Sequence, residues 1–150
     1  MRARVRTVGR AAALLVIALA LAACTSRTGV VFEQNAGALT MTQVEQKART
    51  VSVSAASGLD KTGAPAAREK VLIDLRTRGA EGQRAATLLT KGFPQDTPSV
   101  PVWVGVCSVD GVRSVVVIEA YPDKAGQLSW RRLWVFDLDT GAVRLAASFH

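Results

Sequence analysis

Histidine, cysteine and tyrosine are scarce in this chain of 150 residues, which contains one histidine, two cysteines and one tyrosine. The histidine, His150, is the last residue, where no following structure can hold it in a catalytic network. Catalytic pairs of the Ser-His or Cys-His kind are therefore not predicted. His150 and Cys107 are also too few and too far apart to suggest a metal site, and no cofactor is expected.

A calcium site is the one metal site that the sequence superficially suggests. Asp137 and Asp139 alternate before Gly141, as aspartates do at the start of an EF-hand loop. The twelfth position of such a loop would be Ser148, where a bidentate glutamate is required. We therefore interpret the segment as a turn in which aspartate side chains bind nearby backbone amides.

The N-terminal segment has the layout of an export signal, with basic residues followed by an apolar run. Ala11–Ala22 is the apolar run, and its twelve residues would span about 18 Å as a helix, which is short of the roughly 30 Å of a bilayer core. The charge asymmetry predicts that the residues after the run are exported. The basic residues are Arg2, Arg4, Arg6 and Arg10.

The sequence Leu21-Ala22-Ala23-Cys24 closes the apolar run and resembles the lipobox of bacterial lipoprotein signal peptides. The resemblance covers residues 1–24 only. It implies that signal peptidase II cleaves between Ala23 and Cys24, and that the Cys24 thiol carries a diacylglyceryl group. Two or more acyl chains, palmitate among them, would hold the protein stably on a membrane.

Two other fates remain open for this segment. Ala20-Leu21-Ala22 also fits the small-x-small pattern of ordinary signal cleavage, which would release a secreted protein. An uncleaved membrane stub is the other alternative. The lipobox interpretation predicts a location on the extracytoplasmic face of the cell membrane or on an outer membrane.

The basic character of the chain belongs partly to this leader. Four of the 19 Lys and Arg residues lie there, so the remainder has 15 against 12 Asp and Glu, a formal charge of +3 rather than +7. No basic stripe with interleaved aromatic residues remains, so nucleic acid is not an expected partner. If Cys24 is acylated, Cys107 has no partner for a disulfide, and we interpret it as a small buried apolar residue.

Residues 40–92 show helical periodicity. Two overlapping capping-box patterns, Thr40 with Gln43 and Thr42 with Glu45, predict a helix that begins there and runs to about residue 56. A second helix is expected from Pro65 as its first residue, interrupted at Gly79 and Gly82, with a further apolar stripe ending at Gly92.

Residues 102–149 show strand periodicity instead. Asp110-Gly111 between two valine-rich runs predicts a two-residue hairpin that sets Val109 opposite Val112, Cys107 opposite Ser114 and Trp103 opposite Ile118. Residues 128–137 and 143–149 resemble a second hairpin. The sequence thus predicts an α+β fold with two to three N-terminal helices packed on one face of a C-terminal four-stranded antiparallel meander. The expected organisation is a signal peptide (1–23), a tether (24–29) and a single domain (30–150).

The candidate functional residues outside the leader fall into two groups. The first alternates along the third strand of the meander and forms either a core face under the helices or a stacking surface for a glycan or a protein partner: Trp130, Arg132, Trp134 and Phe136. The second contains the carboxylates outside obvious turns, which are candidates for glycoside or peptidoglycan hydrolysis: Glu45, Glu69 and Glu119.

These residues favour a lipid-anchored accessory or protein-binding module without enzymatic activity, with an envelope protein as the expected partner. A small hydrolase of the cell envelope is one alternative, and it predicts clustered carboxylates in a polar cleft. A sensor or carrier of an apolar ligand is the other, and it predicts a dry cavity between helices and sheet.

Overall fold

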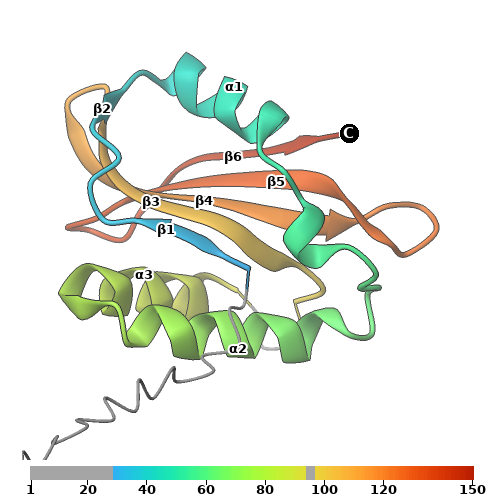
Figure 1. The fold of residues 1–150 in the computed structure, drawn as a ribbon. Coiled ribbons are helices and arrows are strands. Elements are labelled where there is room, and N and C mark those ends of the chain that lie inside the picture. Colours follow the sequence, from blue (N-terminus) through green and yellow to red (C-terminus); the bar gives the residue numbers. More distant parts are fainter. Residues whose placement is uncertain (1–28, 94–96) are drawn as a thin grey trace, which may run out of the picture.

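A computed structural model of the chain describes residues 29–93 and 97–150, which form a central sheet with helices on both sides (Figure 1). The predicted signal peptide (1–23) and residues 24–28 of the predicted tether, including Ala23 and Cys24, lie outside the described residues. Among the described residues, no helix has the length and apolar character needed to cross a bilayer. The elements in chain order are β1 (Val31–Glu33), β2 (Ala38–Leu39), α1 (Met41–Thr50), η1 (Ser54–Ala56), α2 (Ala64–Arg76), α3 (Gly79–Gly92), β3 (Val100–Val109), β4 (Val112–Pro122), β5 (Leu128–Asp137) and β6 (Val143–Phe149).

The sheet is mixed and has six strands, so the predicted fold class is wrong. Its order is β1-β3-β4-β5-β6, with β2 also paired to β3. β1 and β2 run parallel to β3, with Val31 opposite Trp103 and Ala38 opposite Ser108. The consecutive strands β3 to β6 pair antiparallel, but they are part of this larger sheet and do not form a separate four-stranded meander behind N-terminal helices.

The sequence predicts a short strand at residues 30–32, close to β1, but not the parallel pairing of β1 and β2 with β3, because these strands are short and their partner is distant. β1 has three residues and β2 has two, which is too little to show a period of two. Their partner β3 follows about 60 residues later in the chain, after α1, α2 and α3. Parallel pairing requires such a crossover, and nothing in the residues of β1 specifies where its partner lies.

The β3–β4 hairpin has the predicted register, with Val109 opposite Val112, Cys107 opposite Ser114 and Trp103 opposite Ile118. Both turn residues have positive φ, 48° at Asp110 and 79° at Gly111, as a type I′ turn requires. The centre of the hairpin is buried on both faces. A hairpin that is apolar on both sides requires cover on both sides, and the fold provides it.

The helices lie on opposite faces of the sheet, which corrects the prediction of a single helical layer. α1 covers one face, and α2 and α3 cover the other (Figure 1). On the α1 face, the Lys47 ammonium lies 4.3 Å from the centre of the Trp103 ring, and Trp103 Nε1 donates to Glu33. On the other face, the Phe93 ring that follows α3 lies 6.1 Å from Phe136.

α1 begins as predicted and ends earlier. Of the two overlapping capping boxes, the first one forms. Thr40 Oγ1 accepts a hydrogen bond from the Gln43 backbone amide, and Gln43 Oε1 accepts one from the Thr40 backbone amide. The helix ends at Thr50 rather than near residue 56, and Val51 is extended with ψ of 138°. Ser52 Oγ accepts from the Ser54 amide, so a local side-chain bond replaces the helical one there.

α2 and α3 form an antiparallel pair. α2 begins at Ala64, one residue before the predicted start at Pro65. The break between the helices falls at Gly79, which has φ of 75°, but Gly82 lies inside α3 and does not interrupt it. A Cβ at Gly82 would lie 2.3 Å from the Leu75 carbonyl oxygen, so glycine is required there for the close approach of the two helices.

Candidate functional site

The face of β5 that carries the predicted aromatic residues extends beyond the end of α3. Phe136 lies against the last helical residue, Gly92, and is 1% exposed. Trp130, Arg132 and Trp134 are half-buried. The four residues share a face, as predicted, but the structure separates them into a core residue and three that lie at the margin of the helical cover.

Trp134 is held by two contacts. The Phe93 ring packs edge-on against it, with ring centres 4.6 Å apart. Its indole nitrogen donates to Glu119 Oε2 at 3.1 Å. This tryptophan therefore joins the margin of the sheet to a buried polar network.

Arg132 is stacked on aromatic rings. Its guanidinium carbon lies 3.7 Å from the centre of the Tyr121 ring and 5.9 Å from that of Trp134. Within the described part of the chain it forms no ion pair, and the carboxylate directly opposite on β4, that of Glu119, pairs with Arg68 instead. The charge of Arg132 is therefore uncompensated, and the stacking rings limit the positions of its planar group.

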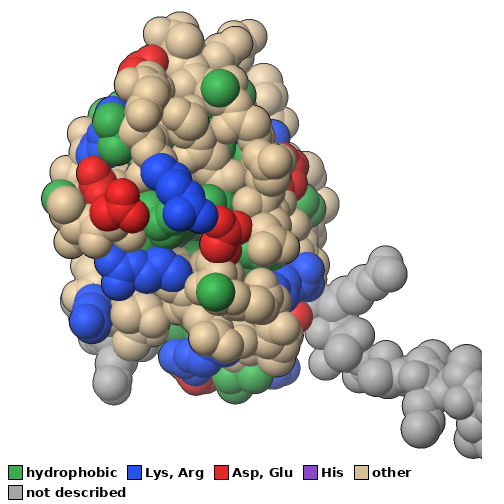
Figure 2. Space-filling model, turned by 90° about the vertical axis from the view of Figure 1, so that its left-hand side faces the viewer, with side chains coloured by type: hydrophobic (Ala, Val, Ile, Leu, Met, Phe, Trp, Pro, Cys, Tyr) green, Lys and Arg blue, Asp and Glu red, His purple; other side chains and the backbone are tan. Residues whose placement is uncertain are grey.

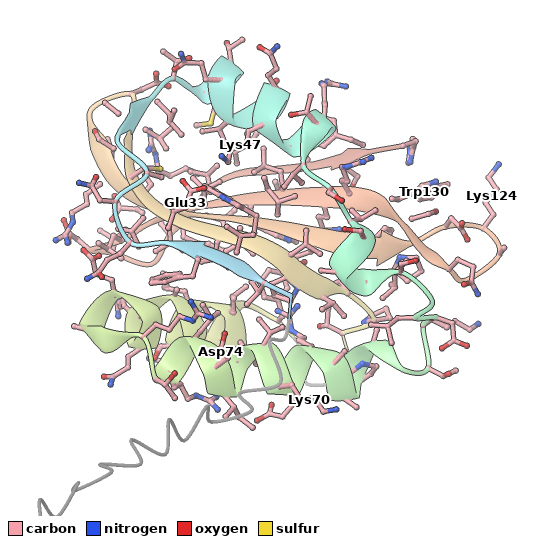
Figure 3. All side chains as sticks on the ribbon, in the orientation of Figure 1. Glu33, Lys47, Lys70, Asp74, Lys124 and Trp130 are labelled. Carbon is pink, nitrogen blue, oxygen red and sulfur yellow. The ribbon has the colours of Figure 1, made fainter. Side chains whose placement is uncertain are left out.

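Trp130 ends this row of side chains. It lies beside the 122–127 turn whose tip carries Lys124 (Figure 3). The ring of the terminal residue, His150, packs on it with centres 4.2 Å apart. We name Tyr121, Trp130, Arg132, Trp134 and His150 the arginine–aromatic surface.

Two members of this surface, Tyr121 and His150, were not among the predicted site residues. Tyr121 faces Trp130 across the β4–β5 pair, but the five-residue connection between these strands does not set a register from sequence. His150 follows Phe149, which pairs with Arg131, and this pairing brings the terminal ring to Trp130. Both residues could have been found only by knowing how β5 pairs with β4 and β6, and the sequence does not fix these two registers.

Beneath the surface lies a buried ion pair between Arg68 of α2 and Glu119 of β4. Arg68 is 3% exposed and Glu119 is 0% exposed. Arg68 Nη1 donates to Glu119 Oε1 and to the Ser99 carbonyl oxygen, and Ser99 Oγ donates to Glu119 Oε2 at 3.0 Å. With the Trp134 indole, both carboxylate oxygens are satisfied, so the pair ties α2, the entry to β3, β4 and β5 together.

The structure does not bring the three candidate carboxylates together. Glu45 lies on α1 and Glu69 on α2, on opposite sides of the sheet. Glu119 is enclosed between them and occupied by its three donors. This arrangement lacks the facing pair of accessible carboxylates that glycoside hydrolysis requires.

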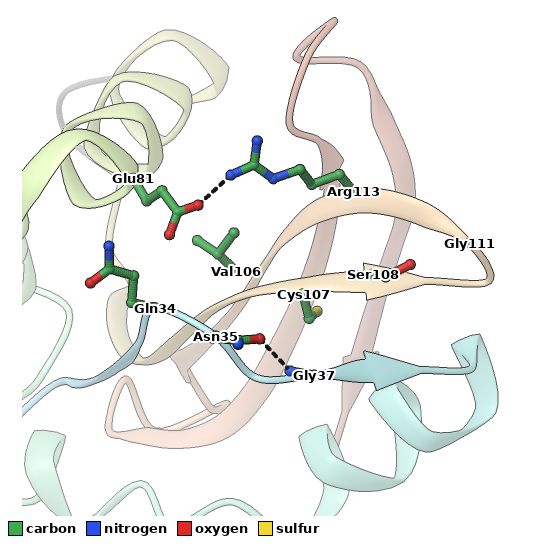
Figure 4. A pocket seen from close by; sticks show the side chains of 9 residues that line it. All are labelled: Gln34, Asn35, Gly37, Glu81, Val106, Cys107, Ser108, Gly111 and Arg113. Atoms are coloured by element: carbon green, nitrogen blue, oxygen red, sulfur yellow. Dashed lines mark hydrogen bonds and ion pairs between the residues drawn. The ribbon is translucent and has the colours of Figure 1, made fainter.

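A groove of about 650 Å³ opens at the other end of the sheet, between the β1–β2 connection, the start of α3 and the β3–β4 hairpin (Figure 4). Glu81 of α3 and Arg113 of β4 form an ion pair across it. Cys107 also lines the groove, and burial together with the negative charge of Glu33 raises the pKa of its thiol. A raised pKa keeps the thiol protonated and weakly nucleophilic.

The charges at this end of the molecule are mixed. Figure 2 shows acidic and basic side chains interspersed around small hydrophobic areas, with no large patch of one sign. Nothing there resembles the continuous basic surface of a nucleic-acid-binding face.

The Asp137–Gly141 segment is a turn, as the sequence interpretation holds. Asp137 Oδ1 accepts from the backbone amides of Asp139 and Thr140, and Gly141 has φ of 77°. These hydrogen bonds lower the pKa of the Asp137 carboxyl. In residues 29–93 and 97–150, no group of three or more His, Cys, Asp or Glu side chains is placed to hold a metal ion.

Comparisons of the chain with protein-family models, with curated proteins and with solved structures gave no match.

Proposed function

We propose that the protein is a lipid-anchored component of the bacterial cell envelope whose folded part is a non-enzymatic module that binds another envelope protein. The anchoring part of the proposal rests on the lipobox-like sequence that ends at Cys24. The binding part rests on one observation: Arg132 is stacked on Tyr121, near Trp134, with no carboxylate partner in the described part of the chain.

Such an arginine is suited to recognition because its conformational freedom is already reduced before a partner binds. A guanidinium that is stacked on rings and flanked by tryptophan presents a charge and apolar area together. The carboxylate opposite Arg132, that of Glu119, pairs with Arg68, so the charge of Arg132 has no partner in the described part of the chain. The surface therefore favours a partner group that carries a carboxylate.

The spacing of the surface favours an extended peptide segment over other occupants. Trp130, Arg132 and Trp134 are alternate residues of one strand, so their side chains recur about every 6.8 Å. Alternate residues of an extended peptide recur at the same interval. We propose a segment of the partner that presents apolar, acidic and apolar side chains at successive alternate positions.

The hydrolase alternative has less support, because its three candidate carboxylates lie apart and the groove cysteine has a raised pKa.

The proposed binding mode can be tested by site-specific photocrosslinking in the native envelope. A photoreactive residue replaces Trp130 in otherwise wild-type protein and in Arg132→Glu. We expect a discrete protein adduct when Arg132 is present and no adduct in the Arg132→Glu background, because a glutamate would repel the partner's carboxylate.

The matched control places the same photoreactive residue at Ile73, an exposed apolar side chain of α2. It should give no such adduct. Adducts that form equally in Arg132→Glu, or equally from position 73, would contradict the assignment of the binding surface.

A further inference from the structure

A pocket of about 380 Å³ lies between α2 and α3, on the side of the molecule shown below the sheet in Figure 1. Four of its eight lining residues are apolar, and they come from both helices and from the residue that follows α3: Pro65, Leu72, Leu89 and Phe93. The polar lining consists of Arg68, Glu69, Arg76 and Thr90. The volume lies within the range of pockets that hold small organic ligands.

Arg68 supplies an unpaired donor at this pocket. The hydrogen bonds from Arg68 to Ser99 and Glu119 are all donated by Nη1. Its Nη2 is buried and has no partner in the described part of the chain. Buried donors are almost always hydrogen-bonded, so this nitrogen marks a position where an acceptor is missing.

The other polar groups of the pocket are an exposed ion pair and a hydroxyl that is already hydrogen-bonded. Arg76 Nη1 lies 3.6 Å from Glu69 Oε1, and Thr90 Oγ1 donates to the Ala86 carbonyl oxygen at 2.7 Å. A ligand would therefore meet apolar walls, the exposed Arg76–Glu69 ion pair and one buried guanidinium nitrogen, Arg68 Nη2, that has no partner in the described part of the chain. That combination suits a molecule with an apolar body and one acceptor group.

We propose that this pocket binds a small monocarboxylate with an apolar tail. One carboxylate oxygen accepts from Arg68 Nη2, and the tail packs between Leu72, Leu89 and Phe93. A carboxylate is favoured over a neutral acceptor because a hydrogen bond between two charged groups is about twice as strong as one between neutral groups. The inference does not rest on the proposed partner binding, since it uses neither Arg132 nor Trp130.

The Phe93 ring lies beside the donor. Its ring centre lies 5.0 Å from the guanidinium carbon of Arg68, and Nη2 has almost no contact with solvent. Phe93 is the first residue beyond α3, has extended backbone angles and is half-buried. We infer that its ring turns aside when the carboxylate enters, which exchanges a cation–π contact for a charged hydrogen bond.

The test is calorimetric titration of the full chain in nanodiscs with hexanoate, with empty nanodiscs as the reference. Saturable binding at one site is expected. Hexanol, which keeps the tail and lacks the carboxylate, should bind at least about tenfold more weakly. Arg68→Lys keeps the charge beside Glu119 and removes Nη2, so hexanoate binding should be lost while hexanol binding is unchanged.

A pocket-filling variant keeps the test decisive if Arg68→Lys does not fold. Leu72→Phe places a ring in the pocket and leaves Arg68 intact, and it should weaken hexanoate binding at least about tenfold. Ile73→Phe adds the same ring at the neighbouring, exposed position of α2 and should have no effect. The proposal is overturned by an absence of saturable binding, by equal affinity for hexanol, or by wild-type affinity in Leu72→Phe.

Discussion

A buried carboxylate is tolerated where each of its oxygens has a donor, and Glu119 meets this condition through three side chains. Arg68, Ser99 and Trp134 approach it from three elements far apart in the sequence. An ion pair of this kind adds little stability compared with apolar residues of the same volume, but losing one member leaves the other charge buried and uncompensated. Glu119 is therefore best understood as a structural residue.

Glu119→Ala should destabilise the fold by about 3–5 kcal/mol, since Arg68 would remain buried without its partner. Chemical denaturation of wild type and variant measures the difference. Glu69→Ala is the matched control, because its carboxylate is 59% exposed and pairs with Arg76 at the surface. The control should change stability by no more than about 1 kcal/mol, and a similar loss in both variants would contradict the structural role of Glu119.

Asp123 carries a prediction about pH. Its carboxylate accepts from Ser129 Oγ and from the amides of Ala125 and Gln127, and these bonds, that of Ser129 first, lower its pKa. A carboxyl with a pKa below its unfolded value stabilises the fold above about pH 3.9, and this contribution is lost as pH falls through the folded value. Asp123→Asn should therefore melt at a lower temperature than wild type at neutral pH, with the difference vanishing in acid.

Thermal melting at several pH values checks this prediction. Asp139→Asn is the control, because the Asp139 carboxylate accepts no hydrogen bond in the described part of the chain. A constant difference between Asp123→Asn and wild type across the acid range would show that the turn does not depend on the ionised carboxylate.

At the scale of elements, the structure selects among starts and pairings that the sequence leaves open. Two capping boxes overlap at the start of α1, and the one at Thr40 forms. In this register the buried residues of α1, Val44 and Ala48, are four positions apart and face the sheet. The choice of cap and the packing of the helix are therefore consistent with each other.

Thr40→Ala should cost about 1 kcal/mol, because the Gln43 amide would lose its acceptor. Thr42→Ala is the matched control, since Thr42 is an exposed helical residue for which alanine is at least as favourable. The free energies of unfolding of both variants check the assignment. A larger loss in Thr42→Ala would mean that the second box is the one that caps the helix.

β5 shows where prediction from sequence reaches its limit for a candidate site. The alternation of Trp130, Arg132, Trp134 and Phe136 places them on one face, and the β4–β5 register agrees. The end of α3 at Gly92 decides that Phe136 is core and that the other three lie at the margin. Because helix ends and helix placement depend on tertiary contacts, the strand pattern alone could not separate these roles.

At the scale of the whole molecule, the two helical layers leave one margin of the sheet only partly covered. α1 occupies one face, and α2 and α3 occupy the other (Figure 1). The proposed lipid anchor would hold this domain near a membrane, since a tether of five residues after Cys24 extends at most about 17 Å. The proposed partner would then be met within the envelope.

Under the lipobox interpretation, Cys24→Ala should abolish incorporation of labelled palmitate and release the protein from the membrane fraction, because residues 1–24 contain no other thiol. The matched control is Cys107→Ala, which removes the other cysteine from a buried strand position. It should leave label and membrane fraction unchanged. Retention of label in Cys24→Ala would contradict the lipobox interpretation.

The sequence by itself determined features that depend on neighbouring residues: a helix that starts near residues 40–42, a break at Gly79, and the turn at Asp110-Gly111 with the hairpin register it sets. The lipobox interpretation of the pattern that ends at Cys24 stays a prediction. Only the tertiary structure decided the parallel pairing of β1 and β2 with β3, the placement of helices on both faces, and the joining of Arg68 to Glu119. Local features follow from backbone geometry and hydrogen bonds within a few residues. The others depend on which distant surfaces bury each other, and that is decided by packing of the complete chain.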